Sequence, residues 1–227
     1  MQNEITATKD TSLTQAQFFN RVYTWMASGV ALTGVVAYLI HNSQLLHKLL
    51  YQPSVVIPLF ILQLIMVITI TYSAAAKKLG TTLTTSIFLL YAIISGVTLS
   101  GILEFYTKQS IYQAFGITAA TFTACSIYGF VTKKDLTTLG SLCLMAVWGL
   151  ILALLVSMFL ANTWLDIVIN VVGILAFVGL TAYDTQKLQE YSDDPDMAPL
   201  GSLILYLDFI NLFIYILRLS SGNGSKD

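Results

Sequence analysis

One acidic side chain stands in the middle of a segment that is otherwise suited to the interior of a lipid bilayer. The segment runs from Leu200 to Leu217, and as an α-helix it would extend about 27 Å, close to the width of a bilayer core. Asp208 lies at its centre, where a carboxylate costs about 2.5–3.5 kcal/mol on insertion scales. Such an acid is expected to face protein or water and to have a function, although a structural carboxyl group hydrogen-bonded to a neighbour would also fit.

Three further polar residues share the helical face of Asp208. Asn211, Tyr215 and Arg218 follow it at spacings of three, four and three residues, which places all four side chains in one stripe. We expect Asn211 to support the carboxylate through a hydrogen bond. Tyr215 and Arg218 also have an ordinary alternative role as anchors at the membrane surface. Other segments must enclose the stripe, because lipid cannot satisfy its polar groups.

A second carboxylate, Asp184, ends the preceding apolar segment. It completes a helical face that also contains Asn170, Gly173, Phe177 and Thr181. Asp184 and Asp208 can meet if the last helix tilts or begins deep in the protein. Two carboxylates in contact cannot both ionise at low cost, so we expect them to share one proton and to act as a pH sensor and gate. The pair would also suit a calcium ion, whereas the simpler alternative is that Asp184 is an interfacial acid facing water.

Milder polar residues mark two earlier segments. Gln63 is the one strongly polar residue inside the second apolar run, and Tyr91, Ser95 and Thr98 share one face of the third. Gln63, Ser95 and Thr98 could line the same cavity as the aspartates and so form part of a pore. An equally good interpretation is that they hold helices together through hydrogen bonds.

The composition identifies the elements that must position these side chains. Of the 227 residues, 56% are hydrophobic and only 10% are charged, whereas a soluble domain has about 25% charged residues. The chain is therefore predicted to be an all-α integral membrane protein. We expect a polar N-terminal tail at residues 1–20, one transmembrane domain at residues 21–219 and a short C-terminal tail at residues 220–227. Seven spans are predicted, at about residues 22–40, 55–76, 83–103, 111–131, 139–160, 164–183 and 200–217.

The lysine and arginine residues between the spans predict the orientation. If the N-terminus is inside, the inner side holds seven of them: Lys9, Arg21, Lys77, Lys78, Lys133, Lys134 and Lys187. The outer side holds four: Lys48, Lys108, Arg218 and Lys226. Because the excess of positive charge marks the cytoplasmic side, we expect a cytoplasmic N-terminus. The acidic connection 186–199 is predicted to be a loop.

Several kinds of site find no support in the residue pattern. The net charge of −1 leaves no basic surface for a nucleic acid. Cys125 and Cys143 lie inside apolar runs and are predicted to be buried thiols, and His41 and His47 lack a third metal ligand nearby. An intramembrane aspartyl protease would need glycines just before Asp208, and a retinal protein would need a lysine inside the last span. We therefore expect neither an enzyme nor a bound cofactor.

Two strings of the sequence carry a resemblance to a known family. LYLDFINLFIYILRL in the last span and AYDTQKL at the end of the sixth span resemble the pair of signatures of the Bax inhibitor-1 family, the transmembrane Bax inhibitor motif proteins. The strings FLLYAIISGVTLSGIL and TAATFTACSIYGFVTKKDLTTLGS extend the likeness from about Phe88 to Leu219. The chain is similar to the bacterial members in particular.

The resemblance implies seven helices, with six of them in two layers around a central C-terminal helix, and a pH-sensitive calcium leak. The family's paired aspartates fall on Asp184 and Asp208. Bacterial members usually reside in the inner membrane, some modulate a membrane-bound protease, and animal members suppress cell death. Bacterial relatives often carry a glutamate in the second helix and an arginine towards its end. This chain has Gln63 and the lysines Lys77 and Lys78 there, so an ion path using that position would bind cations more weakly.

We therefore expect a passive, pH-regulated calcium leak that is gated by the aspartate pair, with the lipid bilayer and the calcium ion as its partners. The alternative is a non-conducting interaction protein that modulates a membrane protease or a stress or cell-death pathway, in which the aspartates are structural. The two hypotheses differ in whether vesicles that contain the protein release calcium faster than empty ones.

Overall fold

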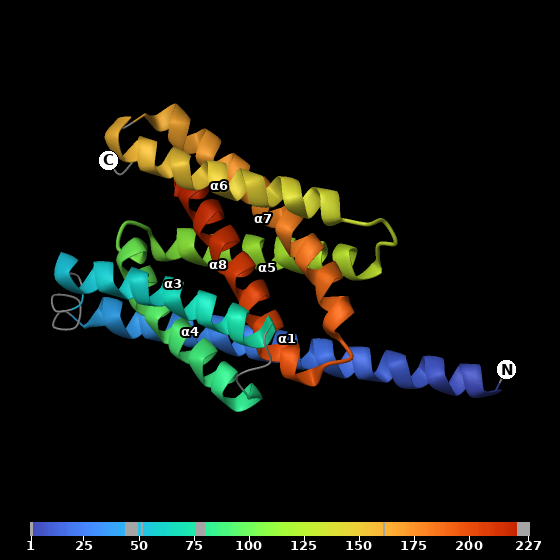
Figure 1. Cartoon of the computed structure of the whole chain (residues 1–227). Helices are drawn as coiled ribbons and strands as arrows, with labels where there is room; N and C mark the ends of the chain where they lie inside the picture. Colours follow the sequence, from blue (N-terminus) through green and yellow to red (C-terminus); the bar gives the residue numbers. More distant parts are fainter. Residues whose placement is uncertain (1, 44–49, 51, 76–79, 161, 222–227) are drawn as a thin grey trace. The chain divides into compact units, whose positions relative to one another are not determined.

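Helices account for nearly all of the chain that the structure describes (Figure 1). The structure is a computed structural model, and it describes residues 2–43, 50, 52–75, 80–160 and 162–221. These residues contain seven α-helices: α1 (Gln2–Asn42), α3 (Pro53–Ala75), α4 (Thr81–Leu103), α5 (Lys108–Val131), α6 (Thr137–Leu160), α7 (Thr163–Leu188) and α8 (Ala198–Ser221). Two 3₁₀ helices, Gln189–Tyr191 and Pro195–Met197, connect α7 to α8. The prediction of an all-α protein is confirmed.

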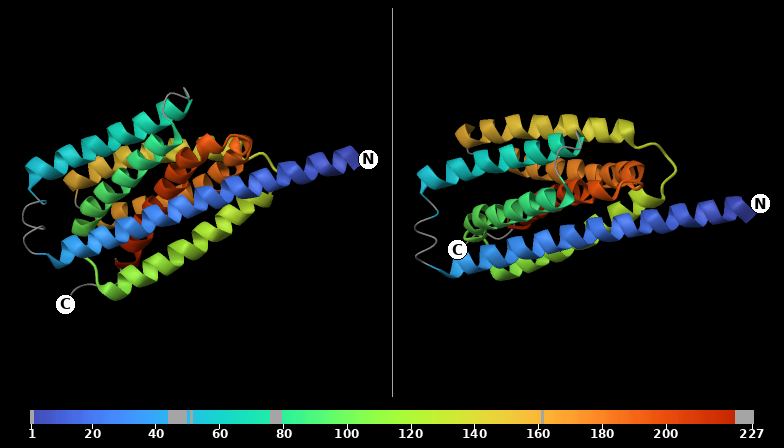
Figure 2. Two further views of the ribbon diagram at one scale, coloured as in Figure 1. Left: turned by 90° about the horizontal axis from the view of Figure 1, so that it is seen from below. Right: turned by 60° about the horizontal axis from the view of Figure 1, so that its bottom comes forward.

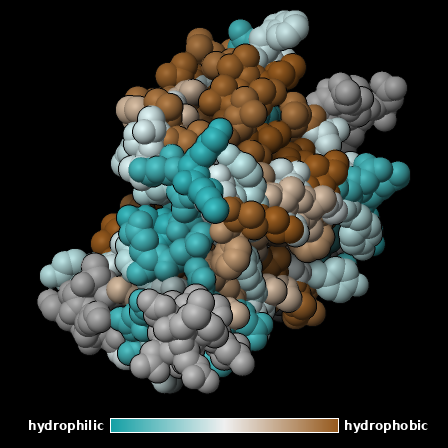
Figure 3. Space-filling view, turned by 90° about the vertical axis from the view of Figure 1, so that its right-hand side faces the viewer, coloured by the Kyte–Doolittle hydropathy of each residue, from teal (hydrophilic) through white to brown (hydrophobic). Residues whose placement is uncertain are grey.

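Most of these helices suit a membrane. Six of those described are long and apolar enough to cross one, and α3 contributes a shorter apolar stretch, Ile57–Tyr72. Large apolar side chains are exposed on their outer faces, for example Trp148 and Phe159 of α6, which are 70% and 87% exposed. Figure 3 shows the corresponding broad apolar surface in brown. Such a surface requires lipid, so the protein is an integral membrane protein in contact with the bilayer.

Two helices begin earlier than the sequence predicts. α1 starts at Gln2 instead of about residue 22, and in Figures 1 and 2 its N-terminal part extends beyond α3 and α4. No glycine or proline interrupts the chain before residue 29, so nothing there ends the helix. α8 starts at Ala198, with Pro199 in its first turn, where the missing N–H of proline is not needed. The predicted loop 186–199 is therefore partly helical.

The chain divides into two compact units. The first comprises Met1–Phe105 and Glu190–Tyr206, and in it both α1 and α3 pack against α4. The second comprises Tyr106–Gln189 and Leu207–Asp227, and in it both α5 and α6 pack against α7. Helix α8 contributes its beginning to the first unit and the remainder to the second. That residues 21–219 form one transmembrane domain stays a prediction.

Glycines bring α5 and α6 close to α7 in the second unit. A Cβ atom added at Gly129 of α5 would collide with the backbone carbonyl of Ala182. One added at Gly140 of α6 would collide with the ring of Tyr183. Close backbone approach of this kind is a common way for helices to associate within a membrane. It holds the part of α7 that carries Asp184 firmly between its two neighbours.

Candidate functional site

The two aspartates meet within the second unit. The carboxyl groups of Asp184 on α7 and Asp208 on α8 lie next to each other, at a separation suited to a hydrogen bond. Asp208 is only 4% exposed, and its Oδ2 atom accepts no hydrogen bond from a donor group in the described part of the chain. An ionised carboxylate can only accept hydrogen bonds, so a hydrogen bond between two carboxyl groups requires a proton on one of them. The contact therefore fits a pair that holds at least one proton, and it does not fit two anions.

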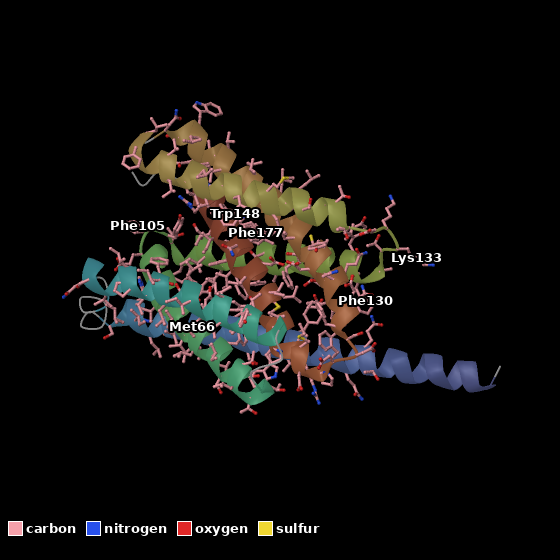
Figure 4. The ribbon with its side chains drawn as sticks, in the orientation of Figure 1. Met66, Phe105, Phe130, Lys133, Trp148 and Phe177 are labelled. Atoms are coloured by element: carbon pink, nitrogen blue, oxygen red, sulfur yellow. The ribbon has the colours of Figure 1, made fainter. Side chains whose placement is uncertain are left out.

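α7 and α8 run antiparallel along this contact. Phe177, labelled in Figure 4, lies seven residues before Asp184 and stacks on Tyr215, which lies seven residues after Asp208. The two ring centroids are 5.8 Å apart. Gly173 provides the space, because a Cβ atom there would come within 2.6 Å of the Tyr215 ring. Tyr215 is buried, so it is a residue of the helix contact and not a surface anchor.

The other two members of the predicted stripe do not contact the carboxylate pair. The side-chain amide of Asn211 donates to the backbone carbonyl of Leu207, one turn earlier in its own helix, at 2.8 Å. A carbonyl one turn back is a close acceptor for a polar side chain in a helix, and here it replaces the predicted bond to the aspartate. Arg218 is partly buried at the end of the stripe. Burial raises the pKa of Tyr106, in the turn before α5, and the charge of Arg218 opposes that shift.

Apolar rings close one side of the pair. Phe209, the residue after Asp208, packs edge-on against Phe115 and Phe122 of α5, with ring centroids 5.6 and 5.5 Å away. Phe209 and Phe122 are both buried. These rings place an apolar surface beside Asp208, whose carboxyl group interacts with that of Asp184.

The two cysteines are free and differ in burial. Cys143 on α6 is buried, as predicted, and lies close enough to Asp184 to interact with its charge. Cys125 on α5 was also predicted to be buried, but it is only partly so. Cys143 is therefore the titratable side chain that α6 presents to the aspartate pair.

The aspartate pair by itself is a small ligand set for a metal ion. No cluster of three or more His, Cys, Asp or Glu side chains suited to a metal occurs among the described residues. Calcium takes about six to eight oxygen ligands, so an ion at Asp184 and Asp208 would need carbonyl groups or water as well. One more buried oxygen without a partner in the described chain, Oδ1 of Asn170, lies on the same face of α7. Calcium binding at the pair stays a prediction.

The predicted pore-lining residues lie in the first unit, where they form hydrogen bonds. Gln63 of α3 donates its side-chain amide to Oγ of Ser95 on α4, at 2.9 Å, and both residues are buried. The Thr98 hydroxyl donates to carbonyls of its own helix. The bond between Gln63 and Ser95 holds α3 against α4, as one of the two interpretations expected. That these residues also line a pore stays a prediction.

Two polar side chains that sequence reasoning missed flank the aspartates. Tyr206 lies two residues before Asp208, and its hydroxyl contacts that of Thr33 on α1 at 2.7 Å. Gln186 lies two residues after Asp184. Both stand inside the strings LYLDFINLFIYILRL and AYDTQKL, which was the available signal. Their partners come from distant parts of the chain, so spacing along one helix could not reveal them.

Gln186 fastens the end of α7 to the turn between α5 and α6. Its amide nitrogen donates to the carbonyl of Lys134 at 2.8 Å and to that of Thr132 at 3.4 Å. Its amide oxygen accepts from the backbone N–H of Leu136 at 2.9 Å. One side chain thus binds both ends of the turn. The helix that carries Asp184 is anchored two residues beyond it.

Replacing Gln186 by alanine is expected to lower the free energy of unfolding by about 1–2 kcal/mol, because a backbone N–H and two carbonyls lose their partner. Gln186→Glu is expected to cost at least as much, since a carboxylate would face the carbonyl of Lys134. Thermal unfolding of the purified protein in detergent measures both. Gln113→Ala, at an exposed position of α5, serves as the control. A wild-type unfolding midpoint for Gln186→Ala would show that the hydrogen bonds of Gln186 contribute nothing to stability.

Comparison with known proteins points to one family. The profile described as "Inhibitor of apoptosis-promoting Bax1" (Bax1-I) matches residues 15–225. The chain is 42% identical over 212 residues to the inner membrane protein YbhL of Escherichia coli K12, which covers 89% of this chain and 90% of YbhL. It is 39% identical over 224 residues to an uncharacterized protein of Borreliella burgdorferi, covering 95% of this chain and 96% of the relative. A membrane protein of Streptococcus pyogenes serotype M3 is 36% identical over 216 residues, covering 91% and 93%. The chain therefore belongs to the Bax inhibitor-1 family of membrane proteins.

Proposed function

We propose that the protein is a passive calcium leak whose opening is controlled by a proton shared between Asp184 and Asp208. The observation that supports this most is the contact between the two carboxyl groups, at a place where Asp208 is shielded from water. A hydrogen bond between them exists only while a proton is present. Without the proton, the same side chains become two hard anionic ligands of the type that calcium prefers.

The sign of the pH response follows from the charges. The protonated pair holds α7 against α8, whereas loss of the proton would put two like charges in contact in a site of low dielectric. Their repulsion would part the two helices, so calcium release is expected to rise as the pH rises through the titration of the pair. Of the neighbouring helices in the unit, α6 presents the Cys143 thiol and α5 presents the rings of Phe115 and Phe122.

We also propose that the protein lies in the bacterial inner membrane with its N-terminus in the cytoplasm. The relative YbhL is called an inner membrane protein, and the excess of lysine and arginine favours this orientation. In the same proposal α8 is the central helix, with the other six around it. In support, Ser202 of α8 donates to the Val22 carbonyl of α1 at 3.0 Å, Tyr206 packs on Phe88 of α4, and Phe209 packs on α5.

The test uses the full-length protein reconstituted in lipid vesicles that contain calcium. Release into a calcium-free medium, followed with a fluorescent indicator, should be faster than from vesicles without protein. The rate should increase between about pH 6 and pH 8, the range in which a shared carboxyl proton can be lost. A rate that falls over this range would contradict the proposed direction of opening.

Equal release with and without protein would contradict the leak and favour the second candidate, a non-conducting protein that modulates a membrane-bound protease or a stress or cell-death pathway. One observation supports that candidate: α1 begins at Gln2, well before its apolar span at Thr14. A helix that continues past the membrane offers a surface to another protein. Deletion of residues 2–13 would then abolish co-purification of a partner without affecting the membrane domain.

A further inference from the structure

A second buried polar cluster lies in the first unit and joins four helices. Its members are Thr33 of α1, Gln63 of α3, Tyr91 and Ser95 of α4, and Tyr206 of α8. None of the five side chains is more than 9% exposed. Buried polar groups are costly unless they are hydrogen-bonded, so the bonds within this cluster decide what it does.

The number of available protons fixes the direction of each hydrogen bond. The Thr33 hydroxyl donates its proton to the carbonyl of Ala92 at 2.8 Å. In its 2.7 Å contact with Tyr206, Thr33 must therefore accept and Tyr206 must donate. Tyr206 has then used its proton, so towards the nearby Ser95 hydroxyl it can only accept. Ser95 in turn accepts from the amide of Gln63 at 2.9 Å.

This series of polar groups begins at an amide and ends at a backbone carbonyl. Neither group exchanges a proton readily near neutral pH, so the series does not conduct protons. The Tyr91 hydroxyl also lies near Ser95, one turn away in the same helix.

The cluster fastens the beginning of α8 to α1 and α4. The Tyr206 hydroxyl bonds to that of Thr33 on α1 and lies near Ser95 of α4. Its ring packs edge-on against Phe88 and Tyr91, with centroids 5.6 and 5.9 Å away. The packing of the Tyr206 ring and the bond of its hydroxyl to α1 restrict the rotation and the depth of α8 at this point.

We propose that Tyr206 is a positioning residue for the aspartate pair, because its hydroxyl sets the rotation and depth of α8 and so the direction in which Asp208 points. This inference depends on the shared proton of the proposed function. Asp208 follows Tyr206 by two residues in an unbroken helix, at a rise of about 3 Å, so a displacement at Tyr206 is transmitted to the carboxyl group. A shift of about 1 Å is enough to take two oxygens out of hydrogen-bonding range.

The test measures the titration of the pair without any ion flux. Proton uptake by the full-length protein in detergent is followed with a pH-indicator dye, and the curve of Asp208→Asn is subtracted. Tyr206→Phe keeps the ring but removes the hydroxyl. Thr33→Val removes the hydroxyl that accepts the hydrogen bond from Tyr206. Both should move the midpoint of the Asp208-dependent uptake to lower pH by roughly half a unit or more, because a looser pair holds its proton less strongly.

Tyr91→Phe is the matched control. It also removes a phenol hydroxyl from the cluster, but that hydroxyl lies near Ser95 of its own helix and does not fasten α8. Its midpoint should equal that of the wild type. Tyr91 is the titratable group that faces Tyr206, and phenols ionise near pH ~10, outside the range of the measurement. Asp184 interacts with Asp208, and Cys143 interacts with Asp184; both residues are retained in all three variants.

An unchanged midpoint in Tyr206→Phe, or an equal shift in Tyr91→Phe, would overturn the inference. If Tyr206→Phe does not fold, the midpoint of Thr33→Val decides in the same way. Because the readout involves no calcium, vesicles that fail to leak would contradict the proposed leak and leave the positioning role standing. Wild-type protein without any Asp208-dependent proton uptake would contradict both.

Discussion

Replacing Asp208 by asparagine is expected to abolish the pH dependence of calcium release. Asparagine has nearly the same shape and still hydrogen-bonds to Asp184, but it cannot gain or lose a proton near neutral pH. If one proton controls opening, the wild-type rate should change by up to about tenfold per pH unit at pH values away from the midpoint of the titration. The rate of the variant should not change with pH. Initial rates of release from reconstituted vesicles at a series of pH values provide the measurement.

Asp166→Asn is the control for this experiment. Asp166 lies in the first turn of α7, the helix that carries Asp184, and it is partly buried. Its replacement removes one carboxylate from the same helix at a site well away from the pair, so the pH profile should remain that of the wild type. Asp184→Asn should behave like Asp208→Asn. A wild-type slope in either variant of the pair would remove the shared proton from the mechanism.

Replacing Gly129 by alanine is expected to destabilise the protein by about 3 kcal/mol or more, at the upper end of the cost of overpacking. The added methyl group would collide with the backbone carbonyl of Ala182 on α7. A backbone atom cannot rotate aside as a side chain can, so α5 and α7 would have to separate. The thermal unfolding midpoint in detergent, monitored by size-exclusion chromatography after heating, should fall sharply.

Gly116→Ala tests whether this effect belongs to the helix contact. Gly116 lies on the same helix, and a Cβ atom there would meet nothing within 4 Å. Alanine favours a helix over glycine by about 0.5–1 kcal/mol, so this variant should be as stable as the wild type or slightly more stable. Comparable losses in both variants would mean that the effect does not arise from the close approach of α5 to α7.

The sequence predicted the helices well because long apolar runs leave few alternatives inside a membrane. The apolar segments around Asp208 and Asp184 are both helical, and the two acids are in contact. The early start of α1 at Gln2 could not be predicted from hydropathy, since residues 2–13 are polar and carry no membrane signal. Helix propensity and the absence of glycine and proline decide that part of the chain.

The hydrogen-bond partners were harder to predict than the helices. A stripe of polar residues says which side chains share a face, but Asn211 bonds to its own backbone, while Tyr206 bonds to Thr33 on the first helix. The choice depends on which groups the tertiary fold brings within about 3 Å, and the sequence of one helix does not contain that information. Gln186 was missed for the same reason, because its partners lie in the turn between α5 and α6.

The central claim is that Asp184 and Asp208 share one proton, and infrared spectroscopy of the protein in lipid tests it most directly. The intensity of the C=O stretch of protonated carboxyl groups is recorded against pH for the wild type, Asp184→Asn and Asp208→Asn. The account predicts one titrating proton that belongs to the pair, which either substitution alone removes or displaces. Two independent titrations, each removed only by its own substitution and unaffected by the other, would contradict it.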